Sequence, residues 1–312
     1  MVGYAVQRLL GAIPIWIAIT LITFILMNVI PGDPVTQLMD ARGGSMDKKV
    51  IEQIREEWGL NDPLPLQYLH FIQGFVQGDL GTSYQTRSPV TDLLLERIPV
   101  TAQITFLGLI VAIVFGITIG IIGALKRGSW LDSLVSSFSI AGVSLPSFLI
   151  GLILMYIFAV KFQLLPASGY ASGELKFLIL PSITLGLGVC GVIARITRSS
   201  MIDILKMDFM TTAYAKGISS WRVVLLHALK NALPPIMTII GVQMGFLLSG
   251  AVITETIFAL PGIGRLLVDG ILQRDLPTVQ GCVVFITSVF LIINLITDIF
   301  CRWIDPRIRL DV

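Results

Sequence analysis

Charge, cysteine and histidine are all scarce in this sequence. Charged residues make up 13% of its 312 residues and hydrophobic residues 54%, whereas soluble domains carry about 25% charged residues. The three cysteines have the spacing of neither a metal site nor a disulfide framework, and the two histidines lie far apart. A net charge of +2 argues against a polyanionic partner such as nucleic acid. The composition is typical of a membrane protein.

Motifs for catalysis are missing as well. The sequence contains no G-x-x-x-x-G-K-[ST] phosphate loop, no G-x-S-x-G elbow and no H-E-x-x-H pair. The chain therefore lacks the usual ATPase site, and we expect it to hold no cofactor. A membrane-embedded enzyme would need a catalytic pair at membrane depth, such as two aspartates, and the apolar runs contain none.

Long uncharged runs are abundant. A helix needs about 20 apolar residues to cross a bilayer core of about 30 Å. Six runs reach membrane-spanning length, which predicts an all-α protein with six transmembrane helices. The first run is too long for a signal peptide and no A-x-A cleavage site follows it, so we interpret it as an uncleaved span. The runs are Leu9–Ile30, Ile98–Leu125, Ser133–Val160, Phe177–Ala194, Asn231–Thr254 and Leu276–Thr297.

The placement of basic residues predicts the orientation of the chain. The segment Arg195–Pro235 contains six basic residues and only two acidic ones. Such an excess next to membrane spans marks the cytoplasmic side. An even number of spans then places both termini in the cytoplasm. The segment Pro31–Arg97 falls on the opposite, extracytoplasmic side.

Pro31–Arg97 is the one sizeable region between the predicted spans. The sequence predicts a helix over Met46–Trp58 that ends at Gly59, and another over Tyr68–Gln77 that ends at Gly78. The region is too small and too poor in apolar residues to form an independent catalytic domain.

The basic segment Arg195–Pro235 is itself predicted to contain a short helix. Asp208 is placed to cap its N-terminus and Gly217 to form a left-handed C-cap, which leaves eight residues between them. A helix of that length spans about 12 Å and needs something to dock against. A second helix is predicted from Ser219 or Ser220 to Lys230, with a stop at Pro234-Pro235. We expect the first helix to present one apolar, solvent-exposed face formed by Phe209, Met210, Ala213, Tyr214 and Gly217.

Stretches of this segment resemble a known family. Thr211-Thr212-Ala213 with Gly217, followed by His227-Ala228-Leu229-Lys230-Asn231-Ala232-Leu233-Pro234, resembles the "EAA" loop of ABC-importer permeases. The similarity is greatest to the dipeptide/oligopeptide/nickel permease family, although the usual Glu is Thr211 here and a common Arg is Tyr214. Other stretches similar to the family are Pro31–Pro34, Trp58–Leu64, Gly78–Ser83, Phe258–Gly264, Arg274–Pro277 and Asp305–Arg309.

The resemblance implies a fold and a set of partners. It implies a type I ABC-importer permease bundle, with the first helix and an extracytoplasmic region in 1–97, a five-helix core in 98–304 and a cytoplasmic tail in 305–312. The implied partners are a homologous second permease, two cytoplasmic ATPase subunits that bind ATP and Mg, an extracytoplasmic solute-binding protein and the lipid of a bacterial inner membrane. In this family the loop couples the permease to the ATPase, so the implied coupling residues are Asp208, Phe209, Met210, Thr211, Ala213, Tyr214 and Gly217.

The resemblance leaves the cargo open. It favours di- or oligopeptides or a related small solute, and a nickel, metal-chelate or glutathione importer of the same architecture is the alternative. The apolar runs contain no Cys/His pair or carboxylate cluster that favours bare metal. A secondary transporter would be expected to show intramembrane carboxylates, and only Asp298 fits. Intramembrane polar residues tend to face a cavity. The residues predicted to line the translocation path are five polar residues and one proline: Gln103, Ser144, Pro146, Gln243, Ser249 and Glu255.

Overall fold

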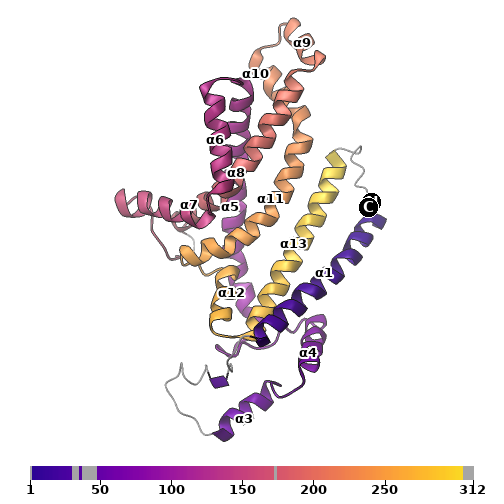
Figure 1. Ribbon diagram of the computed structural model, residues 1–312, viewed down its shortest axis with the longest axis vertical. Helices are drawn as coiled ribbons and strands as arrows, with labels where there is room; N and C mark the ends of the chain where they lie inside the picture. The colour runs from indigo at the N-terminus through magenta and orange to yellow at the C-terminus, as the bar shows by residue number, and fades with distance from the viewer. Residues whose placement is uncertain (1, 30–34, 37–47, 172–173, 305–312) are drawn as a thin grey trace. The chain divides into compact units, whose positions relative to one another are not determined.

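The computed structural model describes residues 2–29, 35–36, 48–171 and 174–304. These residues are mostly helical and contain no β-strand beyond an isolated bridge between Thr82 and Pro89. The family-like stretches Pro31–Pro34 and Asp305–Arg309 lie outside the described residues. The helices (Figure 1) are α1 (Val2–Val29), α3 (Lys48–Glu57), α4 (Leu64–Val76), α5 (Val90–Leu125), α6 (Trp130–Ser144), α7 (Ser147–Leu154), α8 (Lys176–Leu205), α9 (Asp208–Ala215), α10 (Ser220–Arg222), α11 (Lys230–Ile257), α12 (Ile263–Leu272) and α13 (Leu276–Ile304), with π-helical segments η1 (Met155–Lys161) and η2 (Val223–Leu229).

Four helical stretches in the described part of the chain are long and apolar enough to cross a membrane. They correspond to α5, α8, the continuous helix Ser220–Ile257 and the first part of α13. The bent pair α6 and α7 makes a fifth if it counts as one span, and the apolar part of α1, Ile13–Val29, is shorter. The predicted all-α membrane architecture is confirmed, and the structure supports four to five of the predicted spans.

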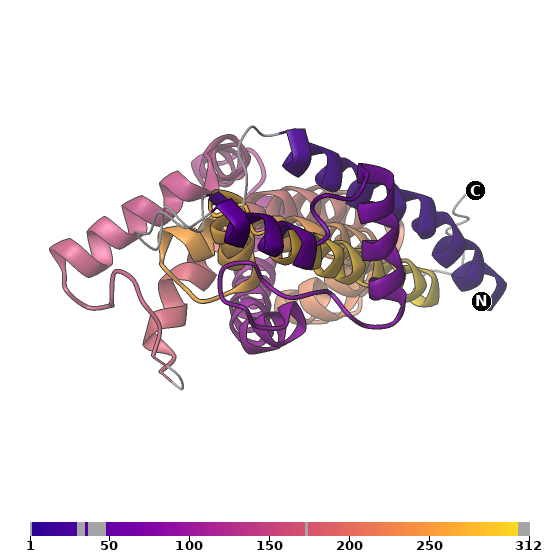
Figure 2. The same ribbon diagram turned by 90° about the horizontal axis from the view of Figure 1, so that it is seen from below.

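The predicted span Ser133–Val160 is not one continuous helix. The chain breaks at Leu145-Pro146, and the two helical parts meet at 109°. Figures 1 and 2 both show α7 running away from α6. Proline disfavours a helical residue before it, and Leu145 is extended, with ψ 128°. The sequence predicts a single span with a kink at Pro146; the structure places a sharp break there instead of a kink, and the two parts together can still count as one span.

Contacts divide the chain into two units. The first comprises Met1–Ala5, Ala102–Leu260 and Ile292–Val312, and the second comprises Val6–Thr101 and Pro261–Leu291. Within the first unit α8 packs against both α6 and α11, as Figure 1 shows. The segment that leads into α9 therefore starts from a helix held on two sides.

Small residues bring α5 and α8 into close contact within the first unit. A Cβ atom added to Gly116 would lie 2.8 Å from the Ile193 side chain, and one added to Gly120 would lie 2.6 Å from the carbonyl oxygen of Ala194. Real Cβ atoms do not come so close, so only glycine fits at these positions without movement. Small residues serve the same purpose in other membrane helix pairs, where they let backbones approach each other.

The second unit contains α3, α4, α12, most of α1 and the first parts of α5 and α13. Helix α4 packs along α1: the ring of Trp16 lies 4.5 Å from that of Phe75, and the hydroxyl of Tyr68 lies 2.9 Å from Thr20 Oγ1. The predicted ends at Gly59 and Gly78 are confirmed, because both have positive φ, 65° and 83°. Each ends a helix as the sequence predicts.

Two features of the second unit differ from the prediction. Helix α5 begins at Val90 rather than at Ile98, so the last part of Pro31–Arg97 belongs to a long helix. Helix α12 was not predicted at all. The reason for the early start is burial: Val90 and Leu94 form a core with residues of α12 and α13, and burying apolar surface stabilises the added turns.

Candidate functional site

Helix α9 is the short helix predicted within the basic segment. It contains eight residues, from Asp208 to Ala215, and Gly217 follows with φ 73°. The backbone N–H of Gly217 donates to the carbonyl oxygen of Tyr214 at 2.9 Å. The left-handed turn predicted at this glycine is confirmed.

The face of α9 that reaches solvent differs from the predicted one. Met210 is 1% exposed and Ala213 7%, and α9 packs against η2. Phe209 and Tyr214 are 40% and 44% exposed, and Trp221 of α10 is more exposed still. The prediction that Met210 and Ala213 belong to the exposed face is wrong. So short a helix is marginal alone, and these two side chains stabilise it within its own chain.

The helix ends around α9 also depart from prediction at two points. Asp208 is the first residue of α9 and Met207 is the N-cap, with no side-chain capping bond; the carboxylate of Asp208 still lies in the first turn, where it interacts favourably with the helix dipole. Ser219 is the N-cap residue of α10, as predicted. The predicted stop at Pro234-Pro235 is wrong, because both prolines lie inside α11. Proline has a helix-compatible φ, and membrane bundles tolerate its missing N–H.

An ion pair joins α6 to the C-terminal part of α8. Arg198 donates from Nε to Asp132 Oδ1 at 2.5 Å and from Nη2 to Oδ2 at 2.8 Å. The backbone N–H of Gly128 also donates to Asp132 Oδ2, at 3.0 Å. Bidentate pairs of this kind are strong and directional. The pair links the start of α6 to the helix that leads into α9.

Sequence reasoning missed this ion pair. Arg198 was counted among the bases of the segment, but its partner lies 66 positions away in the sequence. No local pattern connects two residues at that separation. Helix α12, in contrast, did leave a signal, because Ile263, Leu266 and Leu267 follow Gly262 at helical spacing.

The structure separates the predicted path residues into two groups. Gln243 and Glu255 are buried inside their own chain, Glu255 with no exposed surface. A residue that lines a path between two chains has to be exposed on each chain taken alone, and Gln243 and Glu255 do not meet this condition. Four residues do meet it: Gln103, Ser144, Pro146 and Ser249.

Ser249 belongs to an exposed stripe along α11. Val242, Phe246 and Ile253 are exposed with it, and the four residues follow helical i, i+4, i+7, i+11 spacing. The opposite side of α11 packs against α7 and α8. One side of this otherwise packed helix is thus open to a partner, a pathway or lipid.

Comparison with known proteins decides the family. Residues 116–310 match the family of binding-protein-dependent transport system inner membrane components. Residues 1–105 match the N-terminal part of the membrane components of such systems. This chain belongs to the binding-protein-dependent ABC-importer permeases. The permease is thus a multi-pass membrane protein, a transport subunit and not an enzyme.

Curated relatives match the permease over its whole length. It is 41% identical over 309 residues to the glutathione transport system permease protein GsiC of Escherichia coli O6:H1, which covers 99% of both chains. It is 42% identical over 309 residues to GsiC of Pectobacterium atrosepticum, again over 99% of both chains.

Solved structures share the fold of the permease at low identity. An inward-facing form of the MetNI methionine ABC transporter has a TM-score of 0.57 at 17% identity, covering 68% of this chain and 96% of that chain. An amino acid ABC transporter solved with histidines has a TM-score of 0.50 at 16% identity, covering 70% of this chain and 95% of that chain. At such identities the likeness shows the fold alone.

Proposed function

We propose that the permease forms half of a translocation path for di- or oligopeptides or a related small solute, with glutathione as the leading case. The whole-length similarity to permeases named for glutathione transport supports this cargo. The other half of the path comes from a homologous permease. Gln103, Ser144, Pro146 and the exposed stripe of α11 around Ser249 are the surfaces proposed to line it.

The proposed coupling element is α9 with the turn at Gly217. The observation that carries this assignment is the exposure of Phe209 and Tyr214 on a helix whose Met210 and Ala213 are buried in its own chain. Neighbouring apolar side chains left in water mark an interaction surface. An apolar helix face of this kind fits a groove on a soluble subunit. Asp208 and Thr211 lie in the first turn of the same helix, and they belong to the same proposed contact with the ATPase subunit.

The proposed mechanism is alternating access. Two ATPase subunits close when they bind ATP and Mg, and their closure displaces α9 on each permease. The Asp132–Arg198 pair transmits the displacement from α8 to α6. The bundle then opens outward while an extracytoplasmic solute-binding protein releases its solute. ATP drives this change because it binds the inward-open and outward-open states of the importer with different affinities.

The same proposal places the chain in a bacterial inner membrane with six spans. Helix α1 and the bent pair α6–α7 supply the spans beyond the four long helices. Both termini and α9 then lie in the cytoplasm, and α3 and α4 lie outside. The excess of basic residues in Arg195–Pro235 supports this orientation.

Uptake by the complete importer tests the cargo. The permease, its co-encoded partners and the receptor are reconstituted in liposomes, and ATP-driven uptake of labelled glutathione, dipeptides, longer peptides and nickel is measured. Saturable uptake of glutathione or a peptide is expected. Tyr214→Ala is expected to abolish that uptake without changing solute binding to the receptor. Uptake of nickel alone, or uptake that needs no ATP, would contradict the proposal.

A further inference from the structure

Helix α4 exposes large apolar side chains, although it belongs to the region that the sequence predicts outside the membrane. Leu69 is 59% exposed and Val76 is 78% exposed, and none of the 13 residues of α4 is buried. The helix contains no Asp, Glu, Lys or Arg, whereas six of the ten residues of α3 carry charged side chains. Exposed apolar side chains that lie next to each other mark an interaction surface. Unlike α3, α4 therefore presents a surface that water solvates poorly.

The side chains of α4 fall into stripes by helical spacing. One stripe contains Tyr68 and Phe75, which pack against α1. The neighbouring stripe is apolar and exposed or half-buried, and its members are Leu69, Ile72 and Val76. The next stripe is exposed and mostly polar, and its members are Leu66, His70, Gln73 and Gln77. The apolar stripe thus lies between the contact with α1 and a polar surface, so α4 is amphipathic.

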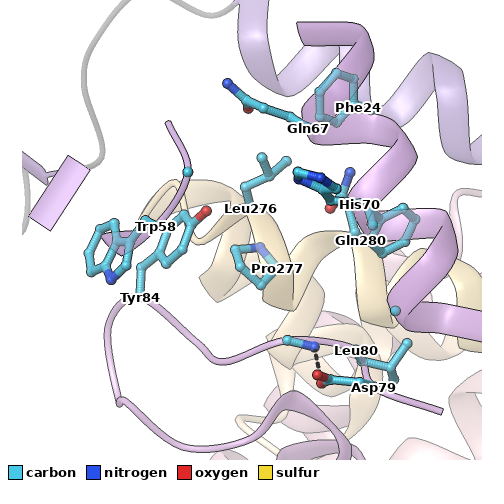
Figure 3. A pocket seen from close by; sticks show the side chains of 14 residues that line it. Phe24, Trp58, Gln67, His70, Asp79, Leu80, Tyr84, Leu276, Pro277 and Gln280 are labelled. Atoms are coloured by element: carbon cyan, nitrogen blue, oxygen red, sulfur yellow. Dashed lines mark hydrogen bonds between the residues drawn. The ribbon is translucent and has the colours of Figure 1, made fainter. Parts of the chain in front are cut away.

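A cavity of about 210 Å³ lies on the side of α4 away from the apolar stripe. Helix α4 contributes Gln67, His70, Phe71 and Gly74 to its lining. Figure 3 shows Gln67 and His70 at this cavity, with Phe24 of α1 next to them. Contact with α1, the cavity and the polar stripe account for three sides of α4, and the apolar stripe remains exposed on the fourth.

Contacts through α1 place α4 beside the apolar part of a membrane span. The indole N–H of Trp16 donates to Ser288 Oγ at 3.3 Å, and Ser288 lies in the middle of the span Leu276–Phe300 of α13. The ring of Phe75 lies 4.5 Å from the ring of Trp16. The carbonyl oxygen of Ile17 accepts from the Tyr68 hydroxyl at 3.3 Å, and Ile17 is itself 44% exposed. The exposed apolar surface of α1 therefore continues onto α4.

The C-terminal end of α4 has the closed backbone bonding that contact with lipid requires. Gly78 has φ 83°, and its N–H donates to the carbonyl oxygen of Phe75 at 2.9 Å. The N–H of Asp79 donates to the carbonyl oxygen of Gly74, also at 2.9 Å. These two bonds form a Schellman motif, and unpaired backbone groups are costly in hydrocarbon. Asp79 lies beyond this turn and lines the cavity, so its charge is on the polar side.

We propose that α4 is an interfacial helix whose apolar stripe lies against the acyl chains of phospholipids at the surface of the bilayer. Helices of this kind bury one apolar face about 5–10 Å into the boundary between headgroups and acyl chains. Leu69, Ile72 and Val76 extend the lipid-facing surface of α1, while Gln73 and Gln77 face headgroups and water. The assignment of α4 to the outer side of the membrane rests on the proposed function, whereas its contact with lipid does not.

Nitroxide labels on single cysteines test this placement. The permease, assembled with its co-encoded partner permease in lipid nanodiscs, is labelled in a Cys301→Ser background, because Cys190 and Cys282 are buried. Electron paramagnetic resonance then compares collisions with O₂, which concentrates among acyl chains, and with a water-soluble chromium complex. Labels at Leu69→Cys and Val76→Cys are expected to lose most of the chromium collisions and to keep those with O₂.

Three control positions make the result specific to the apolar stripe. Gln73→Cys lies one helical turn from Leu69 and is expected to keep the chromium collisions. Glu56→Cys, on the exposed side of α3, reports on water, and Ile22→Cys, on the exposed side of α1, reports on lipid. If the Leu69 label collides with chromium as often as the Gln73 label, the stripe faces water. If the Leu69 label loses both kinds of collision, protein covers the stripe. Either result would overturn the proposal.

A charge placed on each stripe gives a second measurement. Leu69→Asp is expected to lower the midpoint of thermal unfolding in nanodiscs, because a carboxylate is costly among acyl chains. Gln73→Asp is expected to leave that midpoint nearly unchanged, and equal shifts for the two variants would contradict contact with lipid. Neither measurement depends on transport, so ATP-driven uptake by an importer whose α4 lies in water refutes only the placement of α4.

Discussion

Substitution of Gly217 tests whether the turn after α9 acts through its backbone conformation. Gly217 has φ 73°, and a Cβ atom placed there meets nothing within 4 Å. The cost of a side chain is therefore conformational and not steric. An L-residue in the left-handed region costs about 1–2 kcal/mol, asparagine less, and a β-branched residue more. The expected order of damage is Gly217→Asn, then Gly217→Ala, then Gly217→Val.

The expected size of the effect follows from that cost. A loss of about 1–2 kcal/mol lowers the ratio of ordered to disordered α9 about 5- to 30-fold. If α9 seats in the ATPase, the affinity of the ATPase subunits for the permease falls by a similar factor. Affinity is measured by titrating purified ATPase subunits onto permease in nanodiscs, and uptake is measured with the same variants.

A matched control separates local strain from general destabilisation. Gly78 also has positive φ, 83°, and open space around its Cβ position, but it lies in the second unit. Gly78→Val imposes comparable strain and is expected to leave the ATPase affinity unchanged. Equal affinity for Gly217→Asn and Gly217→Val, or an equal loss with Gly78→Val, would refute the reasoning.

Three further predictions concern coupling, stability and orientation. Tyr214→Ala is expected to weaken ATPase binding while membrane insertion, measured by fractionation, is unchanged; unaltered binding would exclude Tyr214 from the contact. Asp132→Asn is expected to lower the free energy of unfolding by about 1.5–3 kcal/mol through loss of bonds to a charged group, in denaturant titrations where the exposed Asp203→Asn serves as control. A cysteine at Gln73 is expected to react with an impermeant thiol reagent in whole cells and one at Lys216 only after lysis; the reverse pattern would invert the orientation.

The features that sequence reasoning predicted correctly are those set by local chemistry. Gly217 and Gly59 mark helix ends because only glycine adopts a left-handed turn at little cost. The eight-residue length of α9 follows from the spacing between Asp208 and Gly217. Four of the predicted spans follow from run length and hydropathy alone.

The features that escaped prediction depend on which elements meet in space. The spacing of α9 groups Met210 and Ala213 with Phe209 and Tyr214, yet only the packing of α9 on η2 decides which of them reach solvent. The early start of α5 depends likewise on a core shared with α12 and α13. At Pro146 the helix breaks sharply, whereas a proline alone predicts a kink within a continuous span.

The glycine contacts between α5 and α8 have a consequence for motion. At Gly116 and Gly120 no side chain of α5 separates it from α8, so rotamer changes there cannot absorb a displacement of either helix. If α9 is the coupling element, a displacement of α9 is expected to move α8 together with α5, and the bidentate ion pair between Arg198 and Asp132 is expected to move the start of α6 with them. Within the first unit α5, α6 and α8 would then move as one rigid group. The hinge of that motion has to lie outside both the glycine contacts between α5 and α8 and the ion pair between Asp132 and Arg198.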